Sequence, residues 1–259
     1  MPFDLEKLPP SSNQNYLNST PFPHVVIDNF LPLNFAELIL KEAIGINESS
    51  WGHYNHYNEM KKGLTETNLM GPNTQLLFSA LNSKSFLVSL SKFTAIDNLI
   101  SDPGLDGGGL HSIERGGFLN IHTDFLSHTK NSNWSRQVNL LIYLNKDWHK
   151  DWNGNLGLWT SDMKSCVHSI EPKFNRCVIF NTVDPSFHGH PEPLLCPPGV
   201  ERRSLALYYY RIEPEKLKLT PTNYRAPAGS SFQHKALIYL DKLALRGYSF
   251  LKRYNLINE

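Results

Sequence analysis

The stretch FLNIHTDF, residues 118–125, is a short strand pattern that carries polar side chains, and the series of runs to which it belongs indicates the fold class. It follows the turn DPGLDGGG (102–109) and belongs to a series of similar runs separated by Gly, Asn, Asp and Pro. The series is LHSIERG, FLNIHTDF, RQVNLLIYLN, NLGLW, CVHSIEP, RCVIFNT and RSLALYYYRI. Many short strands with turn signals between them predict a barrel or sandwich rather than alternating strands and helices.

The chain before this series reads differently. PHVVIDNF (23–30) predicts a short strand, NFAELILKEAI (34–44) predicts a helix with Asn34 as its N-cap, and residues 74–96 predict two short helices. The segment 46–75 is polar and aromatic without a clear period, which predicts a long loop or lid.

The two ends of the chain carry different signals. Residues 1–22, rich in Pro, Ser and Asn, predict a loose arm. SSFQHKALIYLDKLALRGYSFLKRYN (230–255) predicts a basic helix capped by Ser230 or Ser231. That helix would have a solvated face, or would contact a membrane or a partner.

Composition excludes several classes of protein. The 259 residues include 25 basic and 24 acidic side chains, so nothing indicates nucleic-acid binding. The three cysteines, Cys166, Cys177 and Cys196, have no CxxC spacing and predict reduced thiols. We expect no secretory signal and no membrane span, and therefore a cytoplasmic location.

The pair His122 and Asp124 is the first candidate for chemistry. Side chains at i and i+2 of a strand share one face, so an imidazole and a carboxylate could bind one ion. A second histidine would complete the two-histidine, one-carboxylate triad that binds Fe(II) and leaves positions open. PSFHGHPEP supplies two candidates, His188 and His190.

An anion site is the second candidate. ERRSLALYYY (201–210) is a strand pattern that begins with Arg202 and Arg203, and a buried guanidinium matches a carboxylate bidentately. By strand parity Arg202 shares a face with Ser204, which adds a hydroxyl donor. Arg203 remains the alternative to Arg202 as the anion-binding residue. Both arginines could also be surface residues at the start of a strand.

In their order and spacing, these motifs resemble the Fe(II)/2-oxoglutarate-dependent oxygenases of the prolyl-4-hydroxylase-like branch. The segments that carry the resemblance are HTD (122–124), IYLNKDW (142–148), IEPKFNRCVIFNT (170–182), FHGH (187–190) and RRSLALYYY (202–210). The last two are most similar to bacterial predicted proline hydroxylases. The resemblance covers about 105–212, and more loosely 23–45.

The resemblance implies roles for individual residues. His122, Asp124 and His188 would bind Fe(II), with His190 as the alternative third ligand. Arg202, Ser204 and Tyr143 would bind the 2-oxoglutarate co-substrate. Dioxygen is the other co-substrate, and ascorbate is implied as a reductant.

The resemblance also implies a reaction and a fold. An aspartate at position 124 implies hydroxylation, since related halogenases have a small residue there. The substrate would be a small molecule or a peptide: a prolyl residue, free proline or another amino acid. The candidate substrate contacts are Trp51, Tyr54, Tyr57, His111 and Trp134. The fold would be mainly β with flanking helices around a double-stranded β-helix, the jelly-roll or cupin-like core.

A domain division follows from the same reading. Residues 1–22 would be an arm and 23–212 a single oxygenase domain, with helical support at 30–100 and the jelly-roll core at 105–212. Residues 213–259 would be a C-terminal extension.

Two alternatives remain at this stage. A triad of this kind could hold zinc in a hydrolase or in a non-catalytic metal-binding module. The protein could also be an interaction module that uses its basic C-terminal helix.

Overall fold

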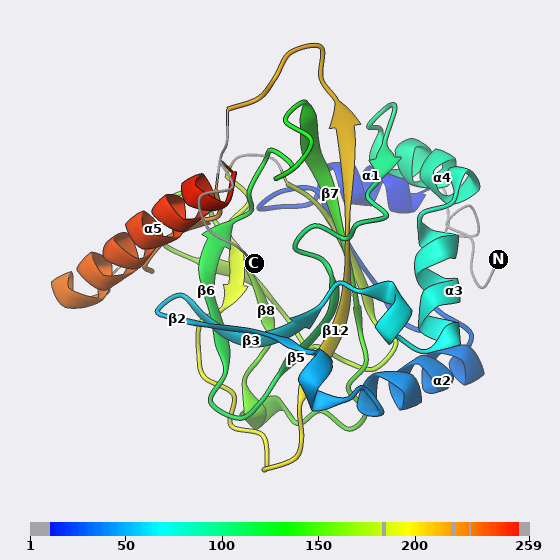
Figure 1. Ribbon diagram of the computed structural model, residues 1–259, viewed down its shortest axis with the longest axis horizontal. Coiled ribbons are helices and arrows are strands. Elements are labelled where there is room, and N and C mark those ends of the chain that lie inside the picture. Colours follow the sequence, from blue (N-terminus) through cyan, green and yellow to red (C-terminus); the bar gives the residue numbers. More distant parts are fainter. Residues whose placement is uncertain (1–10, 183–184, 219–220, 228, 254–259) are drawn as a thin grey trace.

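Antiparallel strands make up most of the regular structure after residue 100, and they curl into a half-barrel (Figure 1). The computed structural model describes residues 11–182, 185–218, 221–227 and 229–253. The strands are β1 (His24–Ile27), β2 (Gly52–His56), β3 (Glu59–Leu64), β4 (Ile100–Ser101), β5 (Gly109–Ile113), β6 (Phe118–Thr123), β7 (Trp134–Tyr143), β8 (Leu156–Trp159), β9 (Cys166–Ile170), β10 (Cys177–Asn181), β11 (His188–His190), β12 (Arg202–Ile212) and β13 (Asn223–Tyr224). The helices are α1 (Ser11–Leu17), α2 (Leu33–Ile44), α3 (Pro72–Leu81), α4 (Lys84–Thr94) and α5 (Phe232–Arg253). The expectation of a mainly β chain with flanking helices is confirmed.

The strand order shows a jelly-roll core. The main path is β1-β10-β7-β12-β5-β3-β6-β11-β8-β9, with β2 paired to β3, β4 to β12 and β13 to β6. Neighbours in this order are seldom consecutive in the chain, as in the double-sheet jelly rolls. The curl brings the end of β6 within hydrogen-bonding reach of β7, where Asn139 contacts Asp124.

Helices α2, α3 and α4 cover one face of the half-barrel (Figure 1). The outward side chains of β7, β10 and β12 pack on these helices and form the largest hydrophobic core. Its fully buried members include Ile39, Leu77, Leu81, Leu90, Leu140, Ile142, Ile179, Leu205 and Tyr209. Each buried side chain of this size contributes roughly 1.5–3 kcal/mol, so this layer fixes which face of the strands is left for the interior.

The prediction of a long loop at 46–75 is wrong. Residues 52–64 form the hairpin β2–β3, and β3 pairs with both β5 and β6, which makes it an internal strand of the sheet. The segment EMKKGL has polar side chains on both faces, because both faces of β3 carry charges that are paired with other residues. Its polar sequence therefore concealed the strand period.

Two N-terminal expectations also need correction. The described part of the arm is packed: Tyr16 of α1 is fully buried and its hydroxyl hydrogen-bonds to Asn181, and Phe22 is buried as well. The helix predicted at 34–44 is present as α2, but Pro32 occupies the N-cap and no side chain caps the helix, so Asn34 lies inside the first turn.

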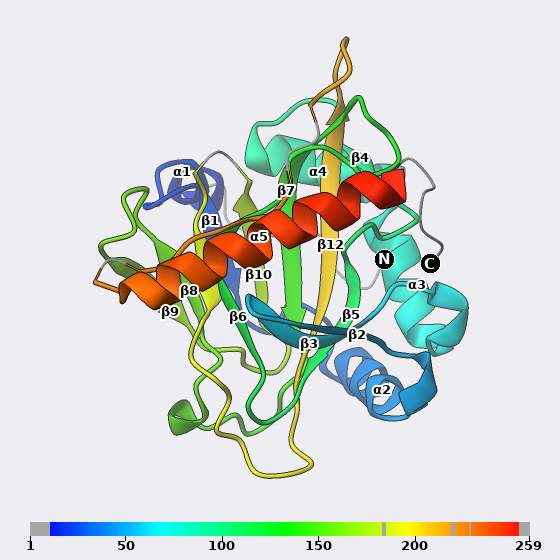
Figure 2. The same cartoon turned by 60° about the vertical axis from the view of Figure 1, so that its left-hand side comes forward.

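The C-terminal segment adds a strand and a helix to the half-barrel (Figure 2). β13 pairs with the end of β6, with Tyr224 opposite His122. Helix α5 begins after Ser231, whose hydroxyl accepts from the backbone N–H of His234, as the predicted cap requires. Within the described residues, no helix is both long enough and apolar enough to cross a membrane.

Candidate metal and anion site

Three buried side chains meet at the open end of β6. The ligand atoms offered by His122, Asp124 and His188 all lie within 4.8 Å of one another. The Nε2 atoms of His122 and His188 lie 3.6 and 3.5 Å from the two carboxylate oxygens of Asp124. Strand pairing explains this closeness, because His188 of β11 is directly opposite His122 of β6. Asp124 follows β6 by one residue.

Backbone carbonyls orient both imidazole rings. His122 Nδ1 lies 2.8 Å from the carbonyl oxygen of Asn120, and His188 Nδ1 lies 2.9 Å from that of Ser186. A carbonyl only accepts, so each Nδ1 carries the proton and each Nε2 presents a lone pair. Burial lowers the pKa of His188 to about 4, although Asp124 opposes the shift. His188 is therefore neutral at pH 7, as a metal ligand must be.

Asp124 is held ionised by its neighbours. Its Oδ2 accepts a hydrogen bond of 2.7 Å from the Asn139 side chain and lies 3.2 Å from a guanidinium nitrogen of Arg136. Burial alone would raise the pKa of Asp124, but Arg136 and the two histidines lower it well below the usual value. Arg136 is itself positioned by Asn139, at 2.8 Å, and by the ring of Tyr208, whose centroid is 3.2 Å from the guanidinium carbon.

A second buried guanidinium lies deeper in the barrel. Arg202 is 5% exposed, donates 2.7 Å to the carbonyl oxygen of Gly154 and lies 3.4 Å from the hydroxyl of Tyr143. Ser204 is directly opposite Tyr143 on the paired strand. Among the described residues, no carboxylate lies within ion-pair distance of Arg202. Burial consequently lowers its pKa, and the site is suited to an anion brought from outside.

The structure separates the two pairs of alternatives. Arg203 faces the other side of β12, where it forms an ion pair of 2.7 Å with Glu201. His190 is buried and pairs with Leu119 after a bulge in β11, so it is not in the group of possible metal ligands that the described residues form. Its Nδ1 has no hydrogen-bond partner among those residues.

The five candidate substrate contacts are not all near this centre. Trp51 is buried in the hydrophobic core, and Trp134 packs on His128 and Tyr210, so neither position supports a substrate contact. Tyr57 hydrogen-bonds to His234 of α5.

Two of the five lie on the interior side of the hairpin. His111 is directly opposite Ser204 and Gly63. The ring of Tyr54 lies over Gly63, where a Cβ would come within 3.0 Å of it.

Sequence reasoning missed three polar residues beside the triad. Glu59 and Lys61 of β3 form a buried ion pair of 2.9 Å, and Tyr224 of β13 hydrogen-bonds to Glu59 while its ring lies 5.4 Å from that of His122. The alternation E-M-K in residues 59–61 could have indicated that the two charges share a strand face. The missing information was that this strand lies inside the sheet.

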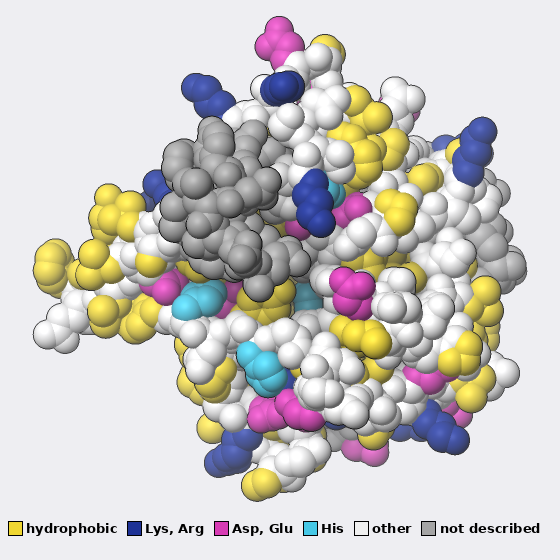
Figure 3. Space-filling model, viewed as in Figure 1, with side chains coloured by type: hydrophobic (Ala, Val, Ile, Leu, Met, Phe, Trp, Pro, Cys, Tyr) yellow, Lys and Arg dark blue, Asp and Glu magenta, His cyan; other side chains and the backbone are white. Residues whose placement is uncertain are grey.

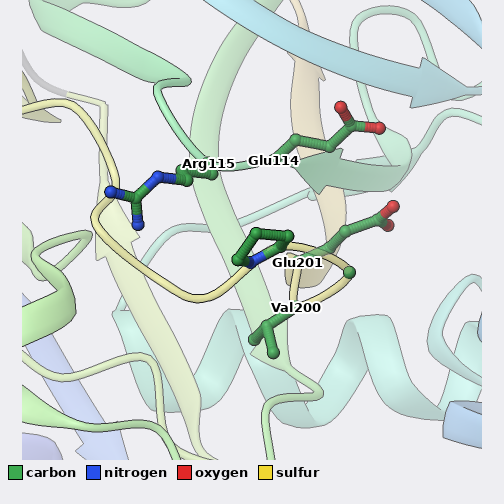
Figure 4. A pocket seen from close by; sticks show the side chains of 6 residues that line it. Glu114, Arg115, Val200 and Glu201 are labelled. Atoms are coloured by element: carbon green, nitrogen blue, oxygen red, sulfur yellow. The ribbon is translucent and has the colours of Figure 1, made fainter.

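A separate pocket lies outside the barrel, at the start of β12 (Figure 4). Its volume is about 340 Å³ and its lining is Glu114, Arg115, Pro198, Gly199, Val200 and Glu201. Glu114 and Glu201 point to the same side, where both form ion pairs with Lys62. The charges of both glutamates are thus compensated by Lys62. The pocket lies on the opposite face of the strands from the triad.

Comparison with known proteins shows what this chain is similar to. Residues 108–210 match the sequence profile of the 2OG-Fe(II) oxygenase superfamily, and they contain the triad, Arg202 and Tyr143. The chain is 27% identical over 219 residues to prolyl 3-hydroxylase OGFOD1 of Mus musculus, which covers 82% of this chain. The chain spans only 36% of the length of that relative.

Solved oxygenase structures share the fold. A Pseudomonas putida prolyl-4-hydroxylase aligns with a TM-score of 0.58 at 16% identity, over 78% of this chain and all of the other. Prolyl 4-hydroxylase of Phytophthora capsici aligns with a TM-score of 0.54 at 22% identity, over 93% of this chain and 74% of the other. At such identities the likeness shows the jelly-roll fold and leaves the activity to be argued from the site.

Proposed function

We propose that the protein is an Fe(II)- and 2-oxoglutarate-dependent dioxygenase that hydroxylates an unactivated C–H bond. The observation that carries the proposal is the combination of two buried groups in one barrel. One is the triad His122, Asp124 and His188, and the other is the unpaired guanidinium of Arg202. A metal site of this donor set has positions open for other ligands, and a dicarboxylate could bridge it to the guanidinium.

Different side chains would bind the metal ion and the co-substrate. His122, Asp124 and His188 would hold Fe(II), with both Nε2 lone pairs already directed by backbone acceptors. Arg202 would pair with the far carboxylate of 2-oxoglutarate, and Ser204 and Tyr143 would donate hydrogen bonds to it. Apolar side chains, among them Leu158 and Phe180, line the same interior cluster as Tyr143 and exclude water.

Iron supplies the oxidising chemistry when it is bound. In the balanced reaction 2-oxoglutarate and dioxygen are converted to succinate and CO₂, while one oxygen atom of O₂ enters the substrate C–H bond as a hydroxyl group. Ascorbate would keep the metal reduced. The chain itself contributes positioning: Asn139 and Arg136 hold the Asp124 carboxylate, so that the metal binds without reorganising its ligands.

The names of the relatives support a substrate class. The mouse relative is named as a prolyl 3-hydroxylase and two structural neighbours as prolyl 4-hydroxylases, which supports a prolyl residue, free proline or a similar amino acid as the substrate. We propose that 23–212 make up the oxygenase domain and that 213–259 are an extension that contributes Tyr224 and α5 to its edge.

A binding experiment tests the function directly. Mn(II) replaces Fe(II) without turnover, and the Kd for 2-oxoglutarate is measured by calorimetry; succinate is then measured with Fe(II) and ascorbate. We expect binding and slow succinate release in the wild type, and loss of binding by at least about 100-fold in Arg202→Met, since a lost charge-assisted bidentate contact is worth about 3 kcal/mol.

Arg203→Met is the matched control, because it removes the neighbouring guanidinium on the opposite face. The alternative of a zinc hydrolase or binding module requires no anion at Arg202. Failure of the Mn(II)-loaded wild type to bind 2-oxoglutarate, or equal binding by Arg202→Met, would rule out the oxygenase function.

A further inference from the structure

The ion pair Glu59–Lys61 lies on the interior face of β3. Register establishes the direction: Lys62 is opposite Ser112 and its ammonium reaches Glu114 on the outside, so its neighbour Lys61 points inward. Gly63, two residues on, is opposite His111, which is opposite Ser204 of the anion site. Lys61 therefore belongs to the same interior as Arg202.

The carboxylate of this pair is held from behind by the C-terminal helix. Asp241 of α5 lies 2.9 Å from His56 Nδ1, and His56 Nε2 lies 3.0 Å from a Glu59 oxygen. The other Glu59 oxygen lies 2.9 Å from Lys61 Nζ. Although burial opposes it, the two carboxylates raise the pKa of His56. Glu59 is thus bonded on one side to His56 and on the other to Lys61.

The pair is close to the metal ligands. Tyr224 hydrogen-bonds to Glu59, and its ring lies 5.4 Å from that of His122, to which it is opposite in the strand pairing. Three side-chain contacts, through Glu59 and Tyr224, therefore connect Lys61 to the triad. A group held by Lys61 would lie on the hairpin side of the metal, away from Arg202.

The ammonium of Lys61 keeps N–H donors that a ligand could use. Among the described residues its ion-pair partner is Glu59, the ring centroid of Tyr54 is 5.2 Å away, and Tyr208 also lies close enough to influence its charge. The Lys61 side chain is 14% exposed. An ammonium has three N–H donors, so acceptors from a ligand can still reach it.

Two histidines, the half-buried His111 and the buried His190, lie near both Lys61 and Arg202. Burial, together with Lys61 and Arg202, lowers the pKa of His111 to about 3, although Glu59 opposes the shift. The His111 ring is therefore neutral at pH 7. His190 Nδ1 is buried and has no hydrogen-bond partner among the described residues, so a polar ligand in this interior could supply one.

Charge balance indicates what that ligand is. Fe(II) and the 2-oxoglutarate dianion neutralise each other. Among the described residues, the interior cations are Arg136, Lys61 and Arg202, and the interior anions are Asp124 and Glu59. Behind Glu59, His56 and Asp241 pair with each other. One positive charge is then left uncompensated, and a buried uncompensated charge is costly. A substrate with one negative charge would remove that cost.

We propose that Lys61 binds a free carboxylate of the substrate, and that the substrate is a small carboxylic acid such as a free amino acid rather than a residue within a polypeptide. The inference rests on the proposed function. The attachment of the hairpin supports it, since Tyr57 and Asn58 in the β2–β3 turn are hydrogen-bonded to His234 and Asp241 of α5. A hairpin fastened in this way restricts the room for a long peptide.

The test compares acids with amides. Fe(II)-loaded full-length protein with 2-oxoglutarate is given each common L-amino acid, the carboxamide of each, and a capped proline-containing peptide, and stimulation of succinate release is measured. We expect at least one free acid to stimulate while its amide and the capped peptide do not. In Lys61→Met the KM for that acid should rise at least about tenfold, as for a lost charged hydrogen bond. Lys61→Arg should restore part of the loss.

Lys62→Met is the matched control, because this lysine is on the same strand and faces outward. It should keep the wild-type KM. The Kd for 2-oxoglutarate with Mn(II) separates a failure of the proposed function from a failure of the inference about Lys61. If the wild type does not bind 2-oxoglutarate, the proposed function itself is contradicted. If the wild type binds 2-oxoglutarate, the inference fails on any of four results. These are equal stimulation by amides or the capped peptide, no stimulation by any free acid, an unchanged KM in Lys61→Met, or a weaker 2-oxoglutarate Kd in that variant.

Discussion

His122 and His188 are directly opposite each other on the antiparallel strands β6 and β11, with ring centroids 4.4 Å apart. Strand register thus brings together two residues far apart in the chain, and the backbone carbonyls of Asn120 and Ser186 direct their Nε2 atoms to one point. A slip of one residue in this pairing would turn one ring to the other face of the sheet. The metal site therefore depends on the pairing of β6 with β11 as much as on the ligands themselves.

Removal of one histidine ligand should abolish tight metal binding. His188→Ala leaves one imidazole and one carboxylate, and we expect the Kd for Mn(II) to rise by at least about 100-fold, since each good ligand contributes several kcal/mol. His149→Ala is the control, because that histidine is on the surface. Calorimetry with Mn(II) measures both. An unchanged Kd in His188→Ala would show that the metal binds at other residues.

The side-chain amide of Asn139, which donates a hydrogen bond to Asp124, should affect the metal affinity nearly as much as His188 does. Asn139→Leu keeps the size of the side chain but removes the hydrogen bond to Asp124 and frees Arg136. We expect metal affinity to fall about 10-fold to 100-fold, the usual cost of losing such a supporting contact. Gln137→Leu, two residues earlier on the same strand, should have little effect. Equal Kd values for the two variants would show that Asp124 does not need Asn139.

Arg202 should reduce the stability of the ligand-free protein. A buried guanidinium without an anionic partner costs free energy, and an apolar replacement of similar length relieves it. Without 2-oxoglutarate, Arg202→Met should unfold at a urea concentration equal to or above that of the wild type. With Mn(II) and saturating 2-oxoglutarate the order should reverse, because only the wild type gains from binding. Destabilisation of the ligand-free variant would mean that Arg202 has a structural role.

The neutral His111 should make the ligand-free protein acid-sensitive. Its pKa is lowered to about 3 in the folded state, mainly by burial, against about 6.5 when unfolded. Below pH 6.5 the unfolded state therefore binds the extra proton, and stability falls as the pH falls. The ring is partly accessible from the barrel interior, so we expect a loss of about 1–2 kcal/mol between pH 6.5 and 5.

His111→Gln should remove that part of the pH dependence. Urea unfolding at several pH values compares the slopes of the two proteins, and the shared contributions of other groups cancel. The same slope in both would mean that the His111 ring becomes protonated without cost in the folded protein.

The contact between α5 and the hairpin should determine how firmly β2 and β3 are held. Asp241→Asn replaces the ion pair to His56 by a neutral contact, and we expect faster amide exchange across 52–64 with unchanged exchange in β7 and β12. The pKa of His56 should fall at the same time, because one of its two carboxylates is gone. NMR titration follows both. Unchanged exchange would mean that strand pairing alone holds the hairpin.

The C-terminal helix also has an exposed apolar stripe, which Figure 3 shows on the part of α5 that extends from the body. Phe232 is 85% exposed, and Tyr239, Leu240 and Leu243 follow it at helical spacing. The expected interaction role of this helix remains a prediction, since the described residues show only its opposite face in use. That face carries Asp241 and Ile238 toward the hairpin.

The sequence by itself determined the strand series of the core and the order of the candidate ligands. Turn residues punctuate the short apolar runs, so β5 to β10 and β12 could be found one by one, whereas β11 was not predicted as a strand. The parity of ERRSLALYYY placed Arg202 with Ser204. These signals are local: each needs only neighbouring residues and the two-residue period of a strand. Helices α3 and α4 were predictable for the same reason, from their own period.

Only the tertiary structure decided which histidine joins the triad, which arginine turns inward, and what surrounds them. His188 rather than His190 meets His122 because β11 bulges between the two, and Arg203 is drawn outward by Glu201. The strand β3 was hidden because its interior charges, Glu59 and Lys61, are compensated by each other and by His56. Burial of a charge depends on partners distant in the chain, and no local pattern encodes those partners.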